Sequence, residues 1–341
     1  MDSIFTTMVI SICVRCWLVI MLFVGVEAQT LTVWRQADRY CIPRIVYLNK
    51  MDKNSADFSA CVESVSKKLS TVPLVVHLPI GVGNKFTGVV DLITMTKFLW
   101  NRKDPHDDGK EYYTQLLDKT KDGVLYDSAV AARARLVEQL ADADATFGDE
   151  FLSCNDADVA SISPEVVVSA LRRAVISQQA VVVLCGSSLR NCAVQLLMDA
   201  VVQFLPDPVE RSGQAHSFAE HYGDSLCALA FKTVHDHQRG ALTFLRLYSG
   251  SLAAGSSVYN VGRECSEHCS KLYQVFADEH QEIGLVTAGN IAAVSGLKQV
   301  WCLLVSSANT TMSFVSTNWI YINQIFWCLY VIGQSVSSSL L

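Results

Sequence analysis

The sequence predicts an α/β domain with an α+β insert, followed by an all-β barrel domain. Up to about residue 208, short apolar runs such as 43–48 and 180–184 alternate with amphipathic helical patterns, as in sheets covered by helices. Beyond a polar segment at 209–222, short alternating strands are separated by glycine turns, which is typical of a barrel. The change of pattern predicts a linker at 209–222 between two domains.

The first 24 residues contain only two charges, Asp2 and Arg15. The apolar run 8–24 is shorter than the roughly 20 residues that span a bilayer. It resembles the apolar part of a signal peptide with an A-x-A-like site at 26–28, but no Lys or Arg precedes it. Alternatively, residues 17–24 fill a strand position in the predicted sheet. A strand and a cleaved leader both remain open, and membrane insertion is the least favoured interpretation.

The α/β domain is predicted from the order of its apolar patterns. A helix at 29–39 leads into the strand that ends at Leu48, and an amphipathic helix follows at 57–69. Pro164 at a first helical position, followed by Glu165, predicts a helix to about residue 178 that leads into the strand 180–184. The remaining predictions are insert strands at 74–78 and 88–92, a polar loop at 101–112, and helices at 128–145 and 192–204.

The barrel is predicted from five short strands, and the chain after it is unusual. No Asp, Glu, Lys or Arg occurs from 299 to 341, whereas about a quarter of the residues of soluble domains are charged. We expect this tail to differ in origin from the barrel. The predicted barrel strands are 226–233, 241–247, 256–259, 270–275 and 290–294.

A candidate base-binding motif follows the strand that ends at Leu48. The carboxyl ends of strands in open α/β sheets are where ligands bind. Asp52 can accept hydrogen bonds from N1–H and the exocyclic amino group of guanine, a pair of donors that adenine lacks on that edge. Asn49 can bond the other edge of the base or neighbouring loops, and the stem of Lys50 can cover the ring face.

A second candidate loop follows the strand 180–184. Ser187, Ser188 and Leu189 come directly after Gly186. This loop resembles the second base-contact loop of a family of nucleotide-binding proteins, in which backbone N–H groups bond the guanine carbonyl. The same four residues are also common turn chemistry. Their order and distance from Asp52 favour the base-contact interpretation over the ordinary turn.

The strings around these loops resemble the elongation factor G family of translational GTPases. They are G-V-E-A-Q-T-L-T-V-W-R-Q-A-D-R-Y-C-I-P-R-I-V-Y-L-N-K-M-D-K-N-S-A-D-F at 25–58, L-P-I-G at 78–81, F-T-G-V-V-D-L at 86–92, V-L-C-G-S-S-L at 183–189, L-A-F-K at 229–232 and A-G-N-I at 288–291. The string H-D-H-Q-R-G-A-L at 235–242 is more similar to the mitochondrial ribosome-releasing factor 2 branch.

The resemblance covers roughly residues 25–298 and implies a division of the chain. It implies a partial P-loop-type G domain at 25–208 with an insert at about 73–161, and a barrel domain II at 223–298. Residues 1–24 and 299–341 are then expected to be foreign to the family, so the tail would have to replace closing strands of the barrel. The resemblance also implies GTP or GDP as ligand with Mg²⁺, the mitochondrial ribosome and a ribosome recycling factor as partners, and a mitochondrial location.

Three motifs of such enzymes are missing from the sequence. There is no G-x-x-x-x-G-K-[ST] phosphate loop, and neither the Asp-x-Pro-Gly motif nor the preceding magnesium-binding switch segment of the family is found. We therefore expect weak nucleotide binding through base contacts alone, with no catalytic residue and no magnesium ligand. His77, His106, His235 and His237 are expected to be surface or core histidines.

Two function classes follow from these observations. One is a guanine-nucleotide-binding translation factor of the ribosome-recycling type, catalytically dead in this form; the other is a non-enzymatic truncated isoform or binding fragment. The formal net charge of −6 argues against broad nucleic-acid affinity, so no DNA partner is expected. Cys265, His268 and Cys269 lack a second pair at finger spacing, so we expect no metal site there. The first residues of the chain are neither Arg-rich nor Ser-rich, so we expect them not to form a transit peptide.

Overall fold

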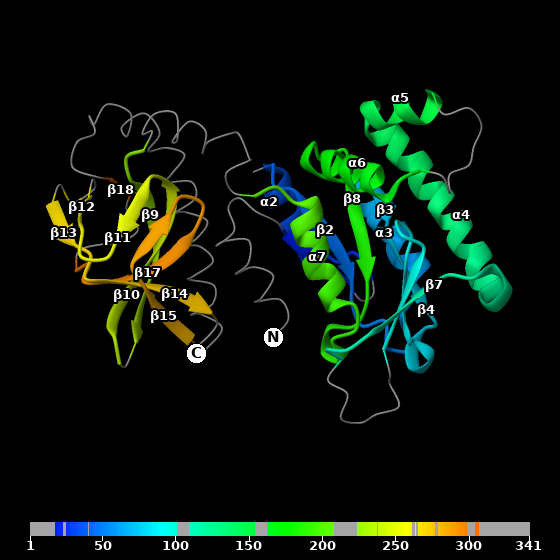
Figure 1. Ribbon diagram of the computed structural model, residues 1–341, viewed down its shortest axis with the longest axis horizontal. Coiled ribbons are helices and arrows are strands. Elements are labelled where there is room, and N and C mark those ends of the chain that lie inside the picture. The colour runs from blue at the N-terminus through cyan, green and yellow to red at the C-terminus, as the bar shows by residue number, and fades with distance from the viewer. Residues whose placement is uncertain are drawn as a thin grey trace. The chain divides into compact units, whose positions relative to one another are not determined.

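The computed structural model divides into two compact units, Met1–Pro206 and Asp207–Leu341 (Figure 1). The structure describes residues 18–22, 25–39, 41–100, 109–153, 162–207, 224–236, 238–260, 263, 265–276, 279–298 and 304–306.

The first unit is built on a parallel sheet of four strands in the order β1-β2-β8-β3. The two middle strands, β2 and β8, are buried at every residue, as expected where helices cover both faces. β1 pairs with β2 from Leu18↔Arg44 to Leu22↔Leu48, so the strand interpretation of the apolar run holds for these residues. The strands are β1 (Leu18–Leu22), β2 (Arg44–Leu48), β3 (Val72–Val75) and β8 (Ala180–Cys185).

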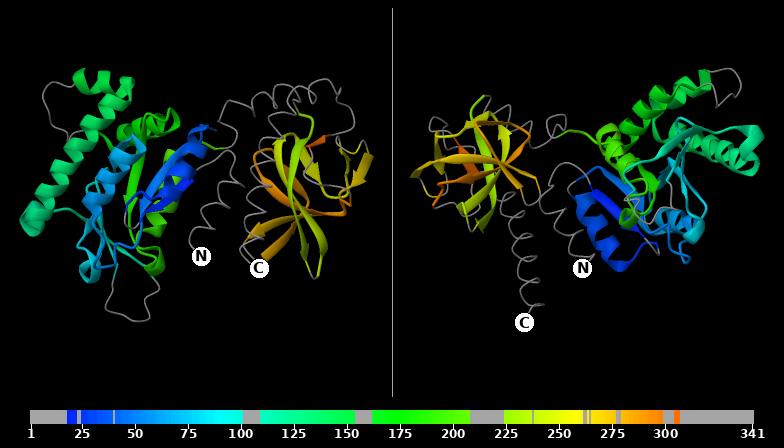
Figure 2. Two further views of the ribbon diagram at one scale, coloured as in Figure 1. Left: turned by 180° about the vertical axis from the view of Figure 1, so that it is seen from behind. Right: turned by 60° about the horizontal axis from the view of Figure 1, so that its bottom comes forward.

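Alternating side chains of the middle strands enter two separate cores. The helices around this sheet can be followed in two further views in Figure 2. On one face Tyr47 and Leu184 pack with residues of α6 and α7, and on the other Leu48 and Val183 pack with residues of α2 and α3. The helices are α2 (Ala28–Arg39), α3 (Phe58–Leu69), α6 (Pro164–Ile176) and α7 (Val194–Phe204). α3 begins as its sequence predicts, because Asp57 accepts a hydrogen bond from the amide of Ala60 at 2.9 Å.

The insert forms an antiparallel sheet in the order β4-β5-β6-β7. The single strand predicted at 74–78 is wrong, because the chain changes sheets at Val76. The amide of Val76 donates to Val183 of the central sheet, and its carbonyl accepts from Leu92. The insert sheet therefore begins at His77, after the expected boundary at residue 73. Its strands are β4 (His77–Ile80), β5 (Gly88–Asp91), β6 (Thr96–Leu99) and β7 (Tyr113–Leu116), with a 3₁₀ turn, η1 (Gly83–Lys85).

Helix α4 (Lys119–Ala143) begins earlier than the predicted helix and is followed by α5 (Ala145–Ser153). Asp118 caps α4 at the amide of Thr120, and Gly123 interrupts it with φ 30° and ψ −99°. Because Gly123 has no Cβ, it tolerates this backbone, which separates a first turn from the rest of the helix.

The described residues contain no helix long and apolar enough to cross a membrane.

The second unit is a β structure. Its main sheet has the order β13-β12-β18-β9-β10-β17-β14-β15, and β11 pairs with β16 separately. β18 comes from the uncharged tail and pairs with both β9 and β12, so the tail supplies one strand of this sheet. The strands are β9 (Cys227–Asp236), β10 (Gly240–Ser249), β11 (Ser251–Ala253), β12 (Ser257–Asn260), β13 (Cys265–His268), β14 (Lys271–Phe276), β15 (Glu279–Ile283), β16 (Leu285–Thr287), β17 (Ile291–Ser295) and β18 (Leu304–Ser306).

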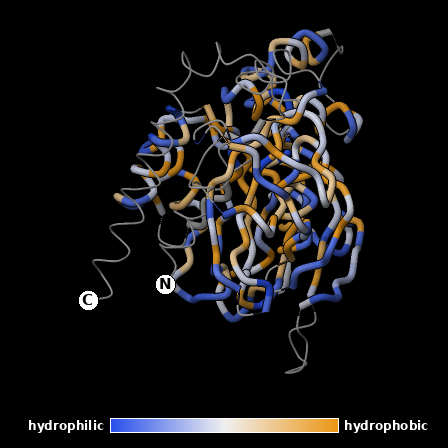
Figure 3. The backbone as a smooth tube through the Cα atoms, turned by 90° about the vertical axis from the view of Figure 1, so that its left-hand side faces the viewer, coloured by the Kyte–Doolittle hydropathy of each residue, from blue (hydrophilic) through white to orange (hydrophobic). Residues whose placement is uncertain are grey.

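The core of the second unit contains Leu245, Leu272 and Val294, which are all fully buried. They come from β10, β14 and β17, which are neighbours in the sheet. Figure 3 shows hydrophobic residues along the strands and hydrophilic residues at many of the turns. The first unit thus contains a parallel sheet whose middle strands lead into the two candidate loops, and the second unit is built of β-strands.

Candidate functional site

The two candidate loops follow the carboxyl ends of two neighbouring strands in the central sheet. β2 and β8 are parallel neighbours, with Leu48 opposite Cys185. The amide of Gly186 donates to the carbonyl of Leu48 at 3.0 Å, and the amide of Met51 donates to the carbonyl of Gly186 at 3.1 Å. Because the two strands end side by side, Tyr47 and Cys192 are hydrogen-bonded although they are 145 positions apart in the sequence.

Asn49 links the loops through its side-chain oxygen. Its Oδ1 accepts from the amide of Lys50 at 2.7 Å and from the amide of Ser188 at 2.9 Å. The amide of Ser188 is thus engaged by Asn49, whereas the sequence predicted that it would face a guanine carbonyl. Of the two roles expected for Asn49, the structure shows the bond to the neighbouring loop.

Lys50 gives the first loop its sharp turn. Its φ of 61° lies in the left-handed region, which costs a residue with a Cβ on the order of 1 kcal/mol and is concentrated at functional sites. The next residue, Met51, is 2% exposed and packs in the core beneath the loop. The turn and this buried anchor fix the position of Asp52.

The carboxylate of Asp52 is oriented by the second loop. Its Oδ1 accepts a hydrogen bond of 2.6 Å from the hydroxyl of Ser187, whose residue is fully buried. A carboxylate has about four acceptor positions on its two oxygens, so this bond uses part of its capacity. Asp52 itself is half-buried, which leaves it accessible to a ligand.

The other two residues of the second loop differ in exposure. Leu189 is 83% exposed. The hydroxyl of Ser188 is buried, and no hydrogen-bond partner for it is found among the residues that the structure describes. A buried hydroxyl without a partner costs about 1–3 kcal/mol.

Gly186 is needed because of close packing beneath the second loop. A Cβ at this position would lie 2.2 Å from the hydroxyl of Tyr47 and 2.5 Å from the carbonyl of Cys192. Tyr47 and Cys192 were not singled out by the sequence, and neither residue type nor local spacing marks them. Their proximity arises only when β2 and β8 become neighbours.

The insert contacts the first candidate loop and the helix that follows the second one. The amide of Gly83 donates to the carbonyl of Met51 at 3.0 Å. On the other side, the carbonyl of Gly109 accepts from Trp100 Nε1 at 3.1 Å and from Gln195 Nε2 at 2.9 Å. Gln195 lies at the start of α7, directly after the second loop. The insert therefore contacts the first loop directly and, through Gly109, the helix that begins after the second loop.

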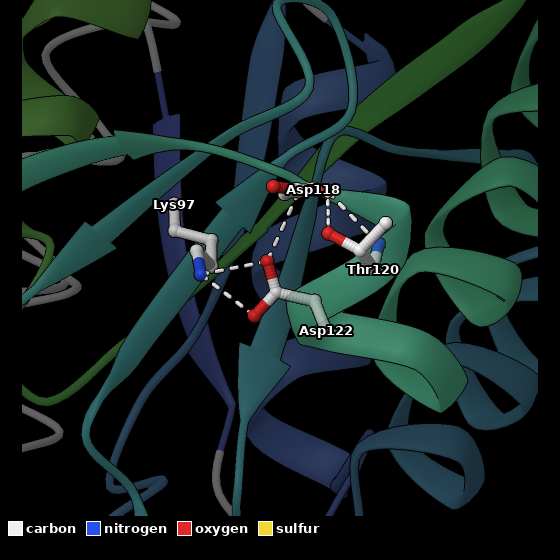
Figure 4. Close-up of polar contacts among 4 residues, drawn as sticks. All are labelled: Lys97, Asp118, Thr120 and Asp122. Atoms are coloured by element: carbon white, nitrogen blue, oxygen red, sulfur yellow. Dashed lines mark hydrogen bonds and ion pairs between the residues drawn. The ribbon is translucent and has the colours of Figure 1, made fainter.

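A second polar cluster lies within the insert (Figure 4). The Nζ of Lys97, a residue that is 8% exposed, donates to both oxygens of Asp122 at 2.7 and 2.8 Å. Asp122 also accepts from the amide of Asp118 at 3.1 Å, and Asp118 accepts from Thr120. The hydrogen bond from Lys97 holds the pKa of Asp122 below its usual range. This cluster fastens the first turn of α4 to β6 and presents no catalytic pair.

The histidine and cysteine candidates form no recognisable catalytic or metal group within the described ranges. Burial lowers the pKa of His77, which lies opposite Asp91 in the insert sheet. Cys265 lies at the start of strand β13 and Cys269 is buried beyond its end, whereas the sequence predicted a loop there. Among the residues that the structure describes, no group of three or more His, Cys, Asp or Glu could hold a metal ion. His106 and His237 lie outside the described residues.

Two family models match the chain. The model described as "Elongation factor Tu GTP binding domain" matches residues 6–207, and the model described as "Elongation factor G domain 2" matches residues 225–302. The first match begins ahead of the boundary expected at Gly25, and the second extends beyond the one expected at Lys298. β1 lies within the first match.

Curated relatives of the same kind match most of the chain. "Ribosome-releasing factor 2, mitochondrial" of Rattus norvegicus is 50% identical over 275 residues, which are 81% of this chain and 35% of the relative. "Elongation factor G 2" of Syntrophomonas wolfei is 38% identical over 283 residues, covering 80% of this chain and 39% of the relative. The chain thus spans little more than a third of the length of these relatives.

A solved structure has the same fold. A crystal structure of a protein from Thermus thermophilus matches with a TM-score of 0.68 and 21% sequence identity, covering 87% of this chain and 41% of the other. At this identity the match supports the arrangement of the elements alone. It agrees with an α/β domain followed by a β-rich domain.

Proposed function

Because the chain belongs to the family of the elongation factor Tu GTP binding domain, we propose that it is a guanine-nucleotide-binding translation factor of the ribosome-disassembly type. The observation that supports the proposal is the pair of hydrogen bonds between the two loops. Ser187 orients the Asp52 carboxylate at 2.6 Å, and Asn49 fixes the Ser188 amide at 2.9 Å. Bonds of this kind preorganise a site before the ligand arrives.

In this proposal Asp52 selects the base. Its carboxylate accepts from N1–H and the amino group of guanine, and such charge-assisted bonds contribute about 1.5–3 kcal/mol each. The apolar stem of Lys50 covers one face of the ring. The hydroxyl of Ser188, buried and without a partner among the described residues, and the backbone of Leu189 are assigned to the rim of the base site.

The 341-residue polypeptide is proposed to bind the nucleotide weakly and not to hydrolyse it. Its sequence contains no G-x-x-x-x-G-K-[ST] loop to hold the phosphates, and phosphoryl transfer depends almost entirely on positioning and electrostatics at those phosphates. Magnesium is typical of the family, but we assign no described residue to it. Phosphate release that is stimulated by ribosomes and abolished by Asp52→Ala would contradict this part of the proposal.

The partners and the location are proposed from the relatives. One of these relatives is a mitochondrial ribosome-releasing factor, so we propose the mitochondrial ribosome as the partner of this chain, with a recycling factor acting beside it, in mitochondria. The net charge of −6 is consistent with local contact patches rather than global attraction to RNA, and no DNA partner is proposed.

The second candidate function is a non-enzymatic binding fragment. The missing phosphate-loop string favours it. A fragment of this kind would keep the β unit and the insert as binding surfaces and would not need a nucleotide. The two candidates differ in one measurable property, the selective binding of guanine.

Calorimetry with guanosine and GDP tests the proposal, and Asp52→Asn is the decisive variant. An Asn side chain replaces one acceptor by a donor, so we expect guanosine affinity to fall about tenfold or more and the preference to move toward xanthosine. Asp127→Asn is the matched control, because Asp127 is an exposed carboxylate on α4. A variant that keeps its preference for guanine over xanthine would refute base selection by Asp52.

A further inference from the structure

The second base-site loop is closed on itself. The amide of Ser187 donates to the carbonyl of Cys192, and the amide of Cys192 donates to the carbonyl of Ser187, both at 3.0 Å. Within the loop, the amides of Arg190 and Asn191 donate to Ser187 and Ser188 at 3.2 Å. Residues 187–192 are therefore joined to one another by backbone hydrogen bonds. The orientation of this loop depends on the residue that contacts it from the core.

Tyr47 contacts this loop from the buried core of the first unit. Its hydroxyl donates to the carbonyl of Cys192 at 3.2 Å, and the whole residue is buried. Tyr47 lies near the end of β2, opposite Leu184, on the sheet face that packs with α6 and α7. Burial raises the pKa of its hydroxyl, so the group stays protonated and remains a donor at ordinary pH.

The space around the hydroxyl fits this role. Gly186 has no side chain, and a Cβ there would lie 2.2 Å from the Tyr47 oxygen, which is closer than any real contact. The hydroxyl thus occupies the space that the glycine leaves open. A Phe at position 47 would fill the same core volume but could not donate to the loop.

We propose that Tyr47 is a positioning residue for base recognition. The contacts run from the Tyr47 hydroxyl to Cys192, across the closed loop to Ser187, and from the Ser187 hydroxyl to the Asp52 carboxylate. Through them, a residue that does not touch the ligand sets the orientation of the carboxylate that selects guanine. This inference rests on the proposed guanine-binding function.

The variant Tyr47→Phe in the full chain tests the proposal with two measurements. Without ligand, hydrogen exchange of the peptide covering 186–193 is expected to become faster, because the loop has lost its anchor. With ligand, guanosine affinity is expected to fall about two- to tenfold, and the ratio of guanosine to inosine affinity is expected to fall with it. Inosine lacks the amino group whose hydrogen bond Asp52 accepts, so the ratio measures how well the carboxylate is placed.

Two controls separate positioning from stability. Tyr126→Phe removes a hydroxyl from α4 and should leave both measurements unchanged. Val167→Ala creates a cavity in the buried core at α6 and should lower the Tm without changing the guanosine-to-inosine ratio. A Tyr47→Phe variant that lowers the Tm but keeps the ratio and the exchange rate overturns the proposal.

The two measurements also distinguish failure of the role of Tyr47 from failure of the proposed guanine binding. If the unmodified chain shows no preference for guanosine, the proposed function fails, and the base-positioning role of Tyr47 fails with it. Exchange at 186–193 still reports in that case whether Tyr47 anchors the loop. If guanosine binds selectively and Tyr47→Phe leaves selectivity and exchange unchanged, only the role of Tyr47 is refuted.

Discussion

Two carboxylates of the first unit, Asp122 and Asp52, have different hydrogen-bond surroundings. Asp122 receives the ammonium of Lys97 on both of its oxygens and the amide of Asp118 as well. Asp52 receives the hydroxyl of Ser187 on one oxygen. The comparison teaches that a carboxylate with its acceptors occupied by the fold stabilises structure, whereas one held in orientation with capacity remaining can bind a ligand.

Replacement of Lys97 is expected to have the largest effect on stability and none on base selection. Lys97→Met keeps most of the buried side-chain volume but leaves the Asp122 carboxylate without its cation, so the first turn of α4 should detach from β6. Thermal unfolding is expected to shift down by several degrees, with the guanosine-to-inosine ratio unchanged. Lys67→Met is the matched control, since Lys67 pairs with Glu63 on an exposed surface. A changed guanosine-to-inosine ratio in Lys97→Met would show that the pair of Lys97 and Asp122 also affects base selection.

The pH dependence of stability should sharpen the same comparison. The hydrogen bond from Lys97 lowers the folded-state pKa of Asp122, so the folded form releases its proton more readily than the unfolded chain, whose Asp pKa is about 3.9. The stability that Asp122 contributes is therefore fully present above that pH and is lost as the pH falls through the lower folded value.

Asp122→Asn is expected to flatten this acid limb. Melting temperatures between about pH 5 and pH 2 should fall less steeply for the variant than for the unmodified chain. Asp127→Asn, on an exposed part of the same helix, should keep the original slope. An unchanged slope in Asp122→Asn would show that the ion pair adds nothing to folding.

The smallest expected effect comes from a hydrogen bond within the insert, next to the contact between the insert and α7. Trp100→Phe keeps an aromatic ring beside Tyr112 but removes the bond from Nε1 to the carbonyl of Gly109. That carbonyl still accepts from Gln195, so guanosine affinity should fall by about twofold or less. A loss as large as that expected for Tyr47→Phe would mean that the insert, and not Tyr47, positions the loop.

The proximity of the two candidate loops could be predicted from the sequence because each loop follows a buried strand. Apolar runs ending in Asn49-Lys50-Met51-Asp52 and in Gly186-Ser187-Ser188-Leu189 indicate two strand ends, and strands of a parallel sheet meet at one edge. The central sheet and the β unit follow from the same patterns. The family match confirms the fold class, while the ligand roles of these residues stay predictions.

Other features depend on contacts that no local pattern contains. Tyr47 and Cys192 are 145 positions apart, and a Tyr in an apolar strand looks like any core residue. β7 is exposed at every position, so it shows no alternation to detect. The bond from the Ser188 amide to Asn49 depends on the rotation of one side chain, which the residue types leave undetermined.

Val76 has a mechanical consequence for the insert. One peptide segment donates to Val183 in the central sheet and accepts from Leu92 in the insert sheet, so no flexible linker separates the two at this point. Because packed protein interiors transmit strain, a load applied to the insert by a bound partner would reach β8 at Val183, three residues before Gly186. A displacement of the insert would then reach the candidate loop at 186–189 through the connections of this one residue.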